Sequence, residues 1–277
     1  MNRRFRQLDV FGSEGGRGNP LAVVLDAEGL DDAAMQDFAH WTNLSETTFL
    51  LPPTDPRADY RVRIFTASTE LPFAGHPTLG SAAAWLDAGG RPRGEVVVQE
   101  CGAGLVEVRG DGDRLAFTAP PLLRHEPVEP ALRERLVAGL GLSAAEVREA
   151  VWLVNGPQWI GLLLADAETV LGVRPQPALL EGLELGLAGL READRGCRLE
   201  VRAFLVHDGM LVEDPVTGSL NAGLGQWLTG TGVLPGSYVA AQGTVLGRAG
   251  RVHVERDGAD VRVGGRAEVL VSGTVAL

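Results

Sequence analysis

The sequence predicts an α+β protein built from two pseudo-symmetric halves, each with a curved sheet wrapped round one helix. The first observation is a loop motif that occurs twice. Segment 70–76, Glu-Leu-Pro-Phe-Ala-Gly-His, has its Glu, Pro and Gly repeated 143 residues later in segment 213–219, Glu-Asp-Pro-Val-Thr-Gly-Ser. The second is a pair of similar β-hairpins, predicted at 104–117 and 250–263, because alternating apolar residues flank a glycine turn in each. Repeats that recur in the same order indicate a duplicated architecture.

A helix rich in small residues follows each copy of the loop. Residues 80–86 read Gly-Ser-Ala-Ala-Ala-Trp-Leu, and residues 220–228 read Leu-Asn-Ala-Gly-Leu-Gly-Gln-Trp-Leu. Small side chains let a helix lie close to a neighbouring sheet, because little side-chain volume separates the two backbones. We therefore expect these two segments to be the central helices.

A weaker third repeat precedes the loops. Segment 19–26, which begins Asn-Pro, resembles Gly156-Pro157 followed by an apolar strand at 159–166. Helices are also expected at 31–41 and at 130–140. Each half therefore contains strands, a short helix, the loop, a buried helix and further strands.

The prolines between residues 120 and 130 mark the boundary between the halves, because they interrupt the strand pattern. We assign residues 1–125, together with the last strand at about 270–277, to the N-terminal half, and residues 126–270 to the C-terminal half. Early in the C-terminal half, Ser143-Ala-Ala-Glu146 has the spacing of a capping box, which predicts a short helix.

Composition excludes several classes of function. The net charge is −11 and no basic run occurs, so a nucleic-acid partner is not expected. All 25 Lys and Arg residues are arginine, which rules out a Schiff-base lysine and a P-loop lysine. No apolar run reaches about 18 residues and residues 1–9 lack a signal-peptide core, so we expect no membrane partner and a cytoplasmic location. The two cysteines, Cys101 and Cys197, read as packing residues.

The repeated loops are the first candidate site. A helix N-terminus presents unpaired backbone N–H groups and the positive end of its dipole. Two such ends, brought to face each other by pseudo-symmetry, would hold an anion such as a carboxylate. Gly75 and Gly218 allow a ligand to approach the backbone closely. The side chains differ where the backbones match, because His76 stands opposite Ser219 and Leu71 opposite Asp214. This divergence indicates an asymmetric task.

Glu46 is a further candidate for proton transfer. It lies between a predicted helix and an apolar strand, and a carboxyl that is desolvated there has a raised pKa suited to a general acid or base. The residues alone do not distinguish Glu46 from Glu70 or Glu213 in this role.

The chain as a whole resembles the PhzF-like family of phenazine biosynthesis, whose fold is similar to that of diaminopimelate epimerase. The resemblance covers essentially all 277 residues. It rests on these segments: Asp9-Val-Phe11, Gly18-Asn-Pro-Leu-Ala-Val23, Asn43-Leu-Ser-Glu-Thr-Thr-Phe49, 70–80, 213–219, Gln242-Gly243 and Gly247-Arg-Ala-Gly250.

The resemblance implies two domains, each a β-barrel-like sheet round a central helix, with the active site in the cleft between them. It implies an isomerase of the trans-2,3-dihydro-3-hydroxyanthranilate isomerase type, acting on a small carboxylate-bearing substrate with no cofactor and no metal. It also implies a homodimer. Glu46 is the implied acid/base, and His76 and Asp214 are the implied catalytic partners.

The same resemblance implies the substrate-binding groups. The amides of Gly75 and Gly218 are expected to bind the substrate carboxylate, and Ser219 is expected to line the site. Asn19 and Ser45 complete the expected substrate-binding residues.

Two other functions stay open at this level. A two-base racemase or epimerase of an amino-acid-like substrate needs a thiolate in each loop, but the loops carry His76 and Ser219. A non-catalytic carboxylate-binding protein would keep the fold without the chemistry. A nicotinamide enzyme is disfavoured, since no strand leads into a Gly-x-Gly-x-x-Gly helix start.

Overall fold

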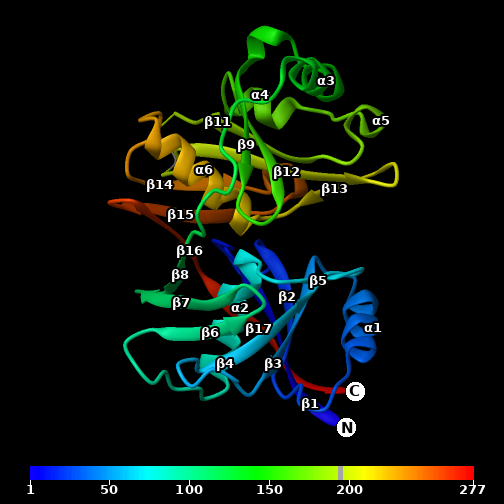
Figure 1. The fold of residues 1–277 in the computed structure, drawn as a ribbon, viewed down its shortest axis with the longest axis vertical. Helices are drawn as coiled ribbons and strands as arrows, with labels where there is room; N and C mark the ends of the chain where they lie inside the picture. The colour runs from blue at the N-terminus through cyan, green and yellow to red at the C-terminus, as the bar shows by residue number, and fades with distance from the viewer. Residues whose placement is uncertain (193–195) are drawn as a thin grey trace. The chain divides into compact units, whose positions relative to one another are not determined.

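The computed structural model describes residues 1–192 and 196–277, and the chain forms two compact units (Figure 1). The first unit contains residues 1–118 and 264–277, and the second contains residues 119–263. The C-terminal strand β17 (Ala267–Ala276) therefore belongs to the unit that begins the chain.

The first unit is mostly sheet. Besides β17, its elements are β1 (Asn2–Val10), β2 (Asn19–Val24), α1 (Asp32–Thr42), β3 (Glu46–Leu51), β4 (Tyr60–Phe65), β5 (Glu70–Leu71), α2 (Gly75–Asp87), β6 (Val97–Cys101), β7 (Gly104–Asp111) and β8 (Arg114–Thr118).

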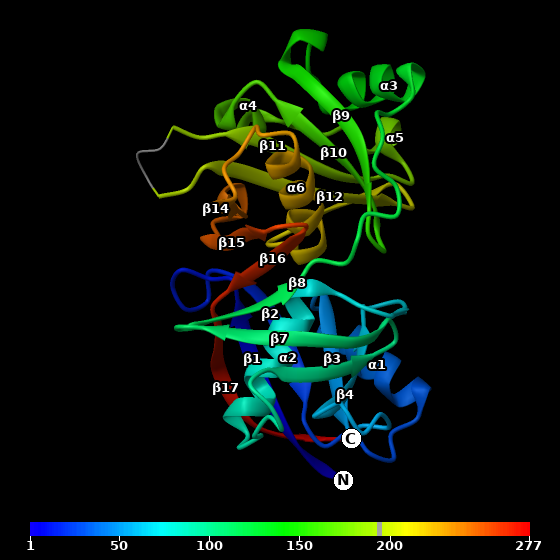
Figure 2. The ribbon, with the colours of Figure 1, turned by 60° about the vertical axis from the view of Figure 1, so that its left-hand side comes forward.

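Its strands pair in the order β17, β1, β2, β3, β4, β6, β7, β8, and β5 adds to β4. Two of the pairings, β2 with β3 and β4 with β6, are parallel, so each needs a crossover connection. Helix α1 lies in the first crossover and α2 in the second. Figure 2 shows α2 enclosed by the strands of this unit, with α1 on the outer face.

The second unit repeats this plan. Its elements are α3 (Pro130–Leu140), a 3₁₀ turn (Ala144–Glu146), β9 (Val147–Val154), β10 (Gln158–Leu164), α4 (Ala167–Gly172), α5 (Pro177–Leu180), β11 (Glu184–Leu190), β12 (Leu199–His207), β13 (Met210–Asp214), α6 (Gly218–Gly230), β14 (Ser237–Gln242), a second 3₁₀ turn (Thr244–Leu246), β15 (Gly250–Asp257) and most of β16 (Asp260–Gly265).

The pairing order in the second unit is β9, β10, β11, β12, β14, β15, with β13 added to β12. The parallel pairs, β10 with β11 and β12 with β14, stand where the parallel pairs of the first unit stand. The crossovers contain α4 and α5 in the first case and α6 in the second. The predicted fold class, two sheets each wrapped round a central helix, is therefore confirmed.

Strand register gives the residue-by-residue match between the units. Phe65 pairs with Glu70 in the first unit, and Phe204 pairs with Glu213 in the second. The hairpin between these partners is longer in the second unit, because β12 and β13 extend to a turn at Asp208-Gly209. On the other side of the same strands, Phe65 pairs with Thr47 and Phe204 with Leu185.

The central helices lie close to their sheets, as their small residues predict. A Cβ added to Gly80 of α2 would lie 2.4 Å from Leu21 Cδ2 of β2. Likewise, a Cβ added to Gly225 of α6 would lie 2.8 Å from Val254 Cγ1 of β15. Any larger side chain at these positions would push helix and sheet apart.

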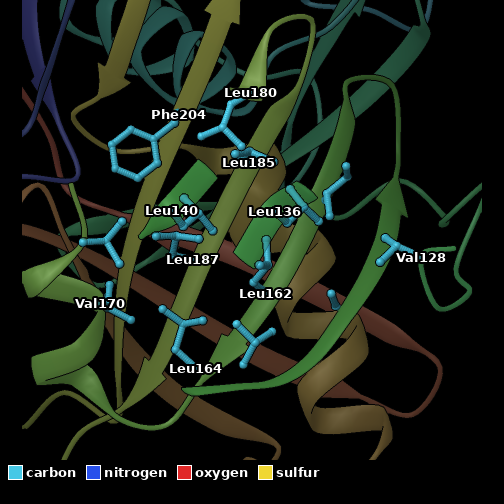
Figure 3. Packing of buried hydrophobic residues seen from close by; sticks show 14 of the residues in the cluster. Val128, Leu136, Leu140, Leu162, Leu164, Val170, Leu180, Leu185, Leu187 and Phe204 are labelled. Carbon is cyan, nitrogen blue, oxygen red and sulfur yellow. The ribbon is translucent and has the colours of Figure 1, made fainter. Parts of the chain in front are cut away.

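The outer face of each sheet is covered by the other helices. In the first unit, Met35 and Phe38 of α1 pack on Val24, Phe49 and Phe65. In the second unit, α3, α4 and α5 cover a larger apolar cluster (Figure 3). That cluster includes the buried residues Leu136, Leu140, Leu162, Leu164, Val170, Leu180, Leu185, Leu187 and Phe204. Burial of apolar surface on both faces is the main stabilising contribution to such a sheet.

Within the described residues, no helix combines the length and the apolar character that crossing a membrane requires.

Candidate functional site

Each repeated loop leads directly into the N-terminus of a central helix. Gly75 is the first residue of α2, and Gly218 is the first residue of α6. The N-cap residues, Ala74 and Thr217, make no side-chain cap hydrogen bond, unlike Asp31, which caps α1 through Ala34 N. Since neither helix start is capped by its own N-cap side chain, backbone N–H groups there are suited to an anionic ligand.

The glutamates that open the two loops are held by arginine. Glu70 accepts two hydrogen bonds from Arg63, at 2.7 and 2.6 Å, and Glu213 accepts two from Arg202, at 2.9 and 2.8 Å. Each arginine lies two residues before the phenylalanine that pairs with its glutamate, and its guanidinium stacks on that ring. These bidentate pairs anchor the loops, which gives both glutamates a structural role.

Glu46 lies beside His76 in the first unit. Glu46 begins β3, His76 is in the first turn of α2, and the Glu46 Oε2 to His76 Nδ1 distance is 3.4 Å. The side chains are only 15% and 4% exposed. The structure therefore brings together the acid/base residue and the histidine that the family resemblance implies.

Burial decides the charge of His76. Desolvation lowers the pKa of His76 to about 3, and the backbone carbonyl of Pro20 acts weakly in the opposite direction. The imidazole is therefore neutral at pH 7. In the described part of the chain, His76 Nε2 is buried and has no hydrogen-bond partner, so its hydrogen-bonding capacity is left for a ligand or an ordered water to satisfy.

The two remaining expected residues of the first unit differ in burial. Asn19 is the first residue of β2, pairs with Val10 and is fully buried. Ser45 is exposed and immediately precedes Glu46 at the start of β3. Both lie next to the β2–β3 parallel pairing, which begins with Leu21 opposite Glu46.

Asp214 in the second unit accepts a hydrogen bond from Thr217. The Thr217 hydroxyl lies 2.6 Å from Asp214 Oδ2. Thr217 in turn contacts Gln242, whose Nε2 lies 2.9 Å from the same hydroxyl oxygen. Gln242 is fully buried, so this network ties the acid to the interior of the unit.

Ser219 is held by two residues that the sequence did not identify. Trp159 Nε1 donates to the Ser219 hydroxyl oxygen at 3.0 Å, and Asn155 Nδ2 donates to the Ser219 carbonyl at 2.8 Å. Because the indole N–H can only donate, the serine hydroxyl keeps its proton for another acceptor. In the sequence, Trp159 is marked only by the weak third repeat, as the first residue of the apolar strand that follows Gly156-Pro157.

Register also reveals a counterpart of Glu46. Glu46 lies opposite Leu21 of β2, and Glu184 lies opposite Trp159 of β10 at the matching position. Glu184 accepts a hydrogen bond from the backbone N–H of Gln158 at 2.6 Å. Desolvation raises the pKa of Glu184. The sequence gives no sign of this match, because the segments around the two glutamates do not look alike.

The family model described as phenazine biosynthesis-like protein matches residues 8–276. The chain belongs to the phenazine biosynthesis-like (PhzF) family. Its pair of sheets, each round one helix, is the diaminopimelate-epimerase-like fold.

Several PhzF-family relatives span the whole chain. Antisense-enhancing sequence 1 of Schizosaccharomyces pombe is 37% identical and covers 97% of this chain and 97% of its own length. The trans-2,3-dihydro-3-hydroxyanthranilate isomerase of Pseudomonas aeruginosa is 34% identical and covers 99% of this chain and 96% of its own length. A PhzF-family crystal structure from Enterococcus faecalis is 26% identical, with a TM-score of 0.82 over 100% of both chains. Like the relatives named as isomerases, this PhzF-family chain is an isomerase.

Proposed function

We propose that the chain catalyses a cofactor-independent proton shift within a small carboxylate-bearing substrate, as in trans-2,3-dihydro-3-hydroxyanthranilate isomerases. The observation that carries this proposal is the contact between the partly buried Glu46 and the buried His76, beside a helix start that has no side-chain cap. Relatives that are named for that reaction cover almost the whole chain at 31–34% identity.

Glu46 is the proton carrier in this proposal. As a carboxylate, it takes a proton from one carbon of the substrate, and the C–H electron pair forms a new double bond. The existing double bond moves, and Glu46 returns the same proton to a second carbon. Atoms and charge balance, so the step needs no redox partner. A positioned acid/base of this kind contributes about 10²–10⁴-fold to the rate.

The other expected residues bind and orient the substrate. Backbone N–H groups at 75–76 and at 218–219 are the proposed anion-binding groups, because they lie at the first turns of α2 and α6. Neutral His76 and hydrogen-bonded Asp214 are the proposed polar partners, with Ser219, Asn19 and Ser45 contributing contacts. Holding the substrate carboxylate rigidly would fix the reacting carbons next to Glu46.

The cysteines do not support a thiolate-based epimerase. Cys101 and Cys197 are buried and lie outside both loops. Desolvation raises the pKa of the Cys101 thiol, which opposes formation of a thiolate.

The test is Glu46→Gln, which keeps the side-chain shape and removes the proton-carrying group. With trans-2,3-dihydro-3-hydroxyanthranilate as the probe, we expect kcat to fall by about 10²-fold or more. Thermal unfolding and circular dichroism serve as the folding control. A Glu46→Gln enzyme that turns over within a few-fold of the unmodified protein would contradict the assignment.

A further inference from the structure

A directed chain of hydrogen bonds in the second unit ends on Asp214. Gln242 Nε2 donates to the Thr217 hydroxyl oxygen at 2.9 Å, and the Thr217 hydroxyl lies 2.6 Å from Asp214 Oδ2. Gln242 Nε2 also donates to the backbone carbonyl of Asp214 at 3.2 Å. The Gln242 amide group therefore contacts the backbone of Asp214 directly and the side chain of Asp214 by way of Thr217.

The direction of this chain is determined by a backbone group. The Thr217 N–H can only donate, and it bonds Gln242 Oε1 at 3.1 Å. Asn221 Nδ2 donates to the same oxygen at 2.8 Å. The Gln242 amide therefore turns its NH₂ group toward Thr217, whose oxygen accepts, and the single hydroxyl proton of Thr217 is left for Asp214.

The first unit also contains a buried glutamine that contacts its central helix. Gln99 lies on β6, the strand that matches β14, and its Nε2 donates to the Thr78 hydroxyl at 3.1 Å. Gln99 Oε1 accepts from the Tyr60 hydroxyl at 2.9 Å. Ala74 stands where Thr217 stands, so no hydroxyl connects Gln99 to the loop. Both matching strands thus contain a buried glutamine, and in the described residues Thr217 links the glutamine of the second unit to a carboxyl group.

We propose that Gln242 and Thr217 are positioning residues that hold Asp214 as an ionised hydrogen-bond acceptor during the reaction. This role rests on the proposed function, in which Asp214 is a polar partner of the substrate. A hydroxyl proton donated to a carboxylate stabilises its charged form and fixes the plane of the group. Asp214 accordingly receives a hydrogen bond from the substrate, while proton transfer to carbon stays with Glu46.

The first experiment measures Asp214 without any substrate. ¹³C NMR of the side-chain carboxyl carbons in the full chain gives the pKa of Asp214 directly, and the Asp214 signal is assigned by its loss in Asp214→Asn. Thr217→Val removes the hydroxyl at nearly constant volume, and we expect the Asp214 pKa to rise by roughly one unit. Thr217→Ser keeps the hydroxyl and restores the original value. An Asp214 pKa that is the same in the Val variant as in the unmodified protein overturns the proposal.

The second experiment separates positioning from folding. With trans-2,3-dihydro-3-hydroxyanthranilate, Thr217→Val lowers kcat by about tenfold, changes KM by less than about threefold, and is rescued by Thr217→Ser. Thr78→Val removes the hydroxyl that Gln99 contacts in the first unit and leaves kcat unchanged. Equal losses in the two valine variants would indicate a purely structural role and overturn the proposal.

Failure of the underlying function gives a different result. If the unmodified protein does not turn over trans-2,3-dihydro-3-hydroxyanthranilate, the proposed reaction is wrong, whereas the NMR titration needs no substrate and still decides whether Thr217 controls Asp214. If Glu46→Gln retains full turnover, the role proposed for Glu46 is wrong.

Discussion

The two loops share a scaffold and differ in the groups that they present. In both units an arginine holds the first glutamate of the loop, and the following helix begins without a side-chain cap from its N-cap residue. The first unit adds a carboxyl–imidazole contact, the partly buried Glu46 with the buried His76. The second adds hydroxyl groups and a hydrogen-bonded acid, with Thr217 on Asp214. The two units thus share the arrangement of loop and helix, and the reactive side chains around the loops differ.

The two arginine–glutamate pairs of the loops, here called the arginine clamps, differ in burial. This difference predicts the largest effect, a contrast in the free energy of unfolding between variants of the two arginines. Arg202 and Glu213 are 3% and 11% exposed, whereas Arg63 and Glu70 are 23% and 41% exposed. Arg202→Met leaves a buried carboxylate unpaired and should lower the free energy of unfolding by about 3–5 kcal/mol. Arg63→Met should cost about 1 kcal/mol or less, because water solvates Glu70.

Urea denaturation of the two methionine variants measures this difference. Methionine keeps most of the apolar stem of arginine, so packing on Phe204 and Phe65 is largely retained. Similar losses in both variants would show that burial does not distinguish the clamps.

His76 and Ser219 occupy matching positions, but we expect only His76 to make the free energy of unfolding depend on pH. The pKa of His76 is lowered from 6.5 to about 3 in the folded chain, so only the unfolded chain binds this proton between those values. Stability from this group is present above pH 6.5 and is lost as the pH falls, by about 2 kcal/mol between pH 7 and pH 5.

Unfolding free energies at pH 7 and pH 5 test this sign. His76→Asn should lose about 2 kcal/mol less than the unmodified protein over that interval. Ser219→Ala should show the same pH dependence as the unmodified protein, since serine does not titrate there. If His76→Asn and the unmodified protein respond identically, His76 is not buried in its neutral form.

The smallest expected effect concerns kcat and the glutamates at matching positions in β3 and β11. Glu184 bonds the Gln158 backbone N–H, while Glu46 faces His76. Glu184→Gln should therefore change kcat by less than about threefold, because the proposed proton transfer of general acid/base catalysis belongs to Glu46.

Glu184 should nevertheless affect how the free energy of unfolding depends on pH. Its pKa is raised by desolvation, so the stability that its neutral form contributes is present at low pH and is lost as the pH rises through the raised value. Comparison of unfolding above and below pH 4.5 in Glu184→Gln and the unmodified protein would reveal this dependence. A kcat loss as large as that of Glu46→Gln would assign Glu184 a part in the chemistry.

The fold could be predicted from the sequence because its signals are local. The Glu-x-Pro-x-x-Gly repeat, the small-residue helices and the helix at Pro130–Leu140 each lie within one short segment. The predicted capping box at Ser143 and Glu146 is also present. The helix cores were predicted at 80–86 and 220–228, but α2 and α6 begin at Gly75 and Gly218. Pro77 lies in the first turn of α2, where proline is tolerated because the N–H groups there lack partners.

The contacts around the loops could not be predicted, since they join residues that are distant in the sequence. Arg202 reaches Glu213 across a hairpin, and Trp159 reaches Ser219 from 60 residues away. These pairs follow from strand register, which is determined by packing over the whole unit. For the same reason, the residues alone could not separate Glu46 from Glu70 and Glu213, and the family resemblance was needed.

The pairing of β1 with β17 has a consequence for how the chain is made. Asn2 lies opposite Ala276, so the first unit gains one of its strands only after the second unit has been synthesised. The second unit is continuous in the sequence, which lets it fold as each of its strands emerges. The unit that contains Glu46 and His76 is thus completed last, by the contacts with the greatest separation along the chain.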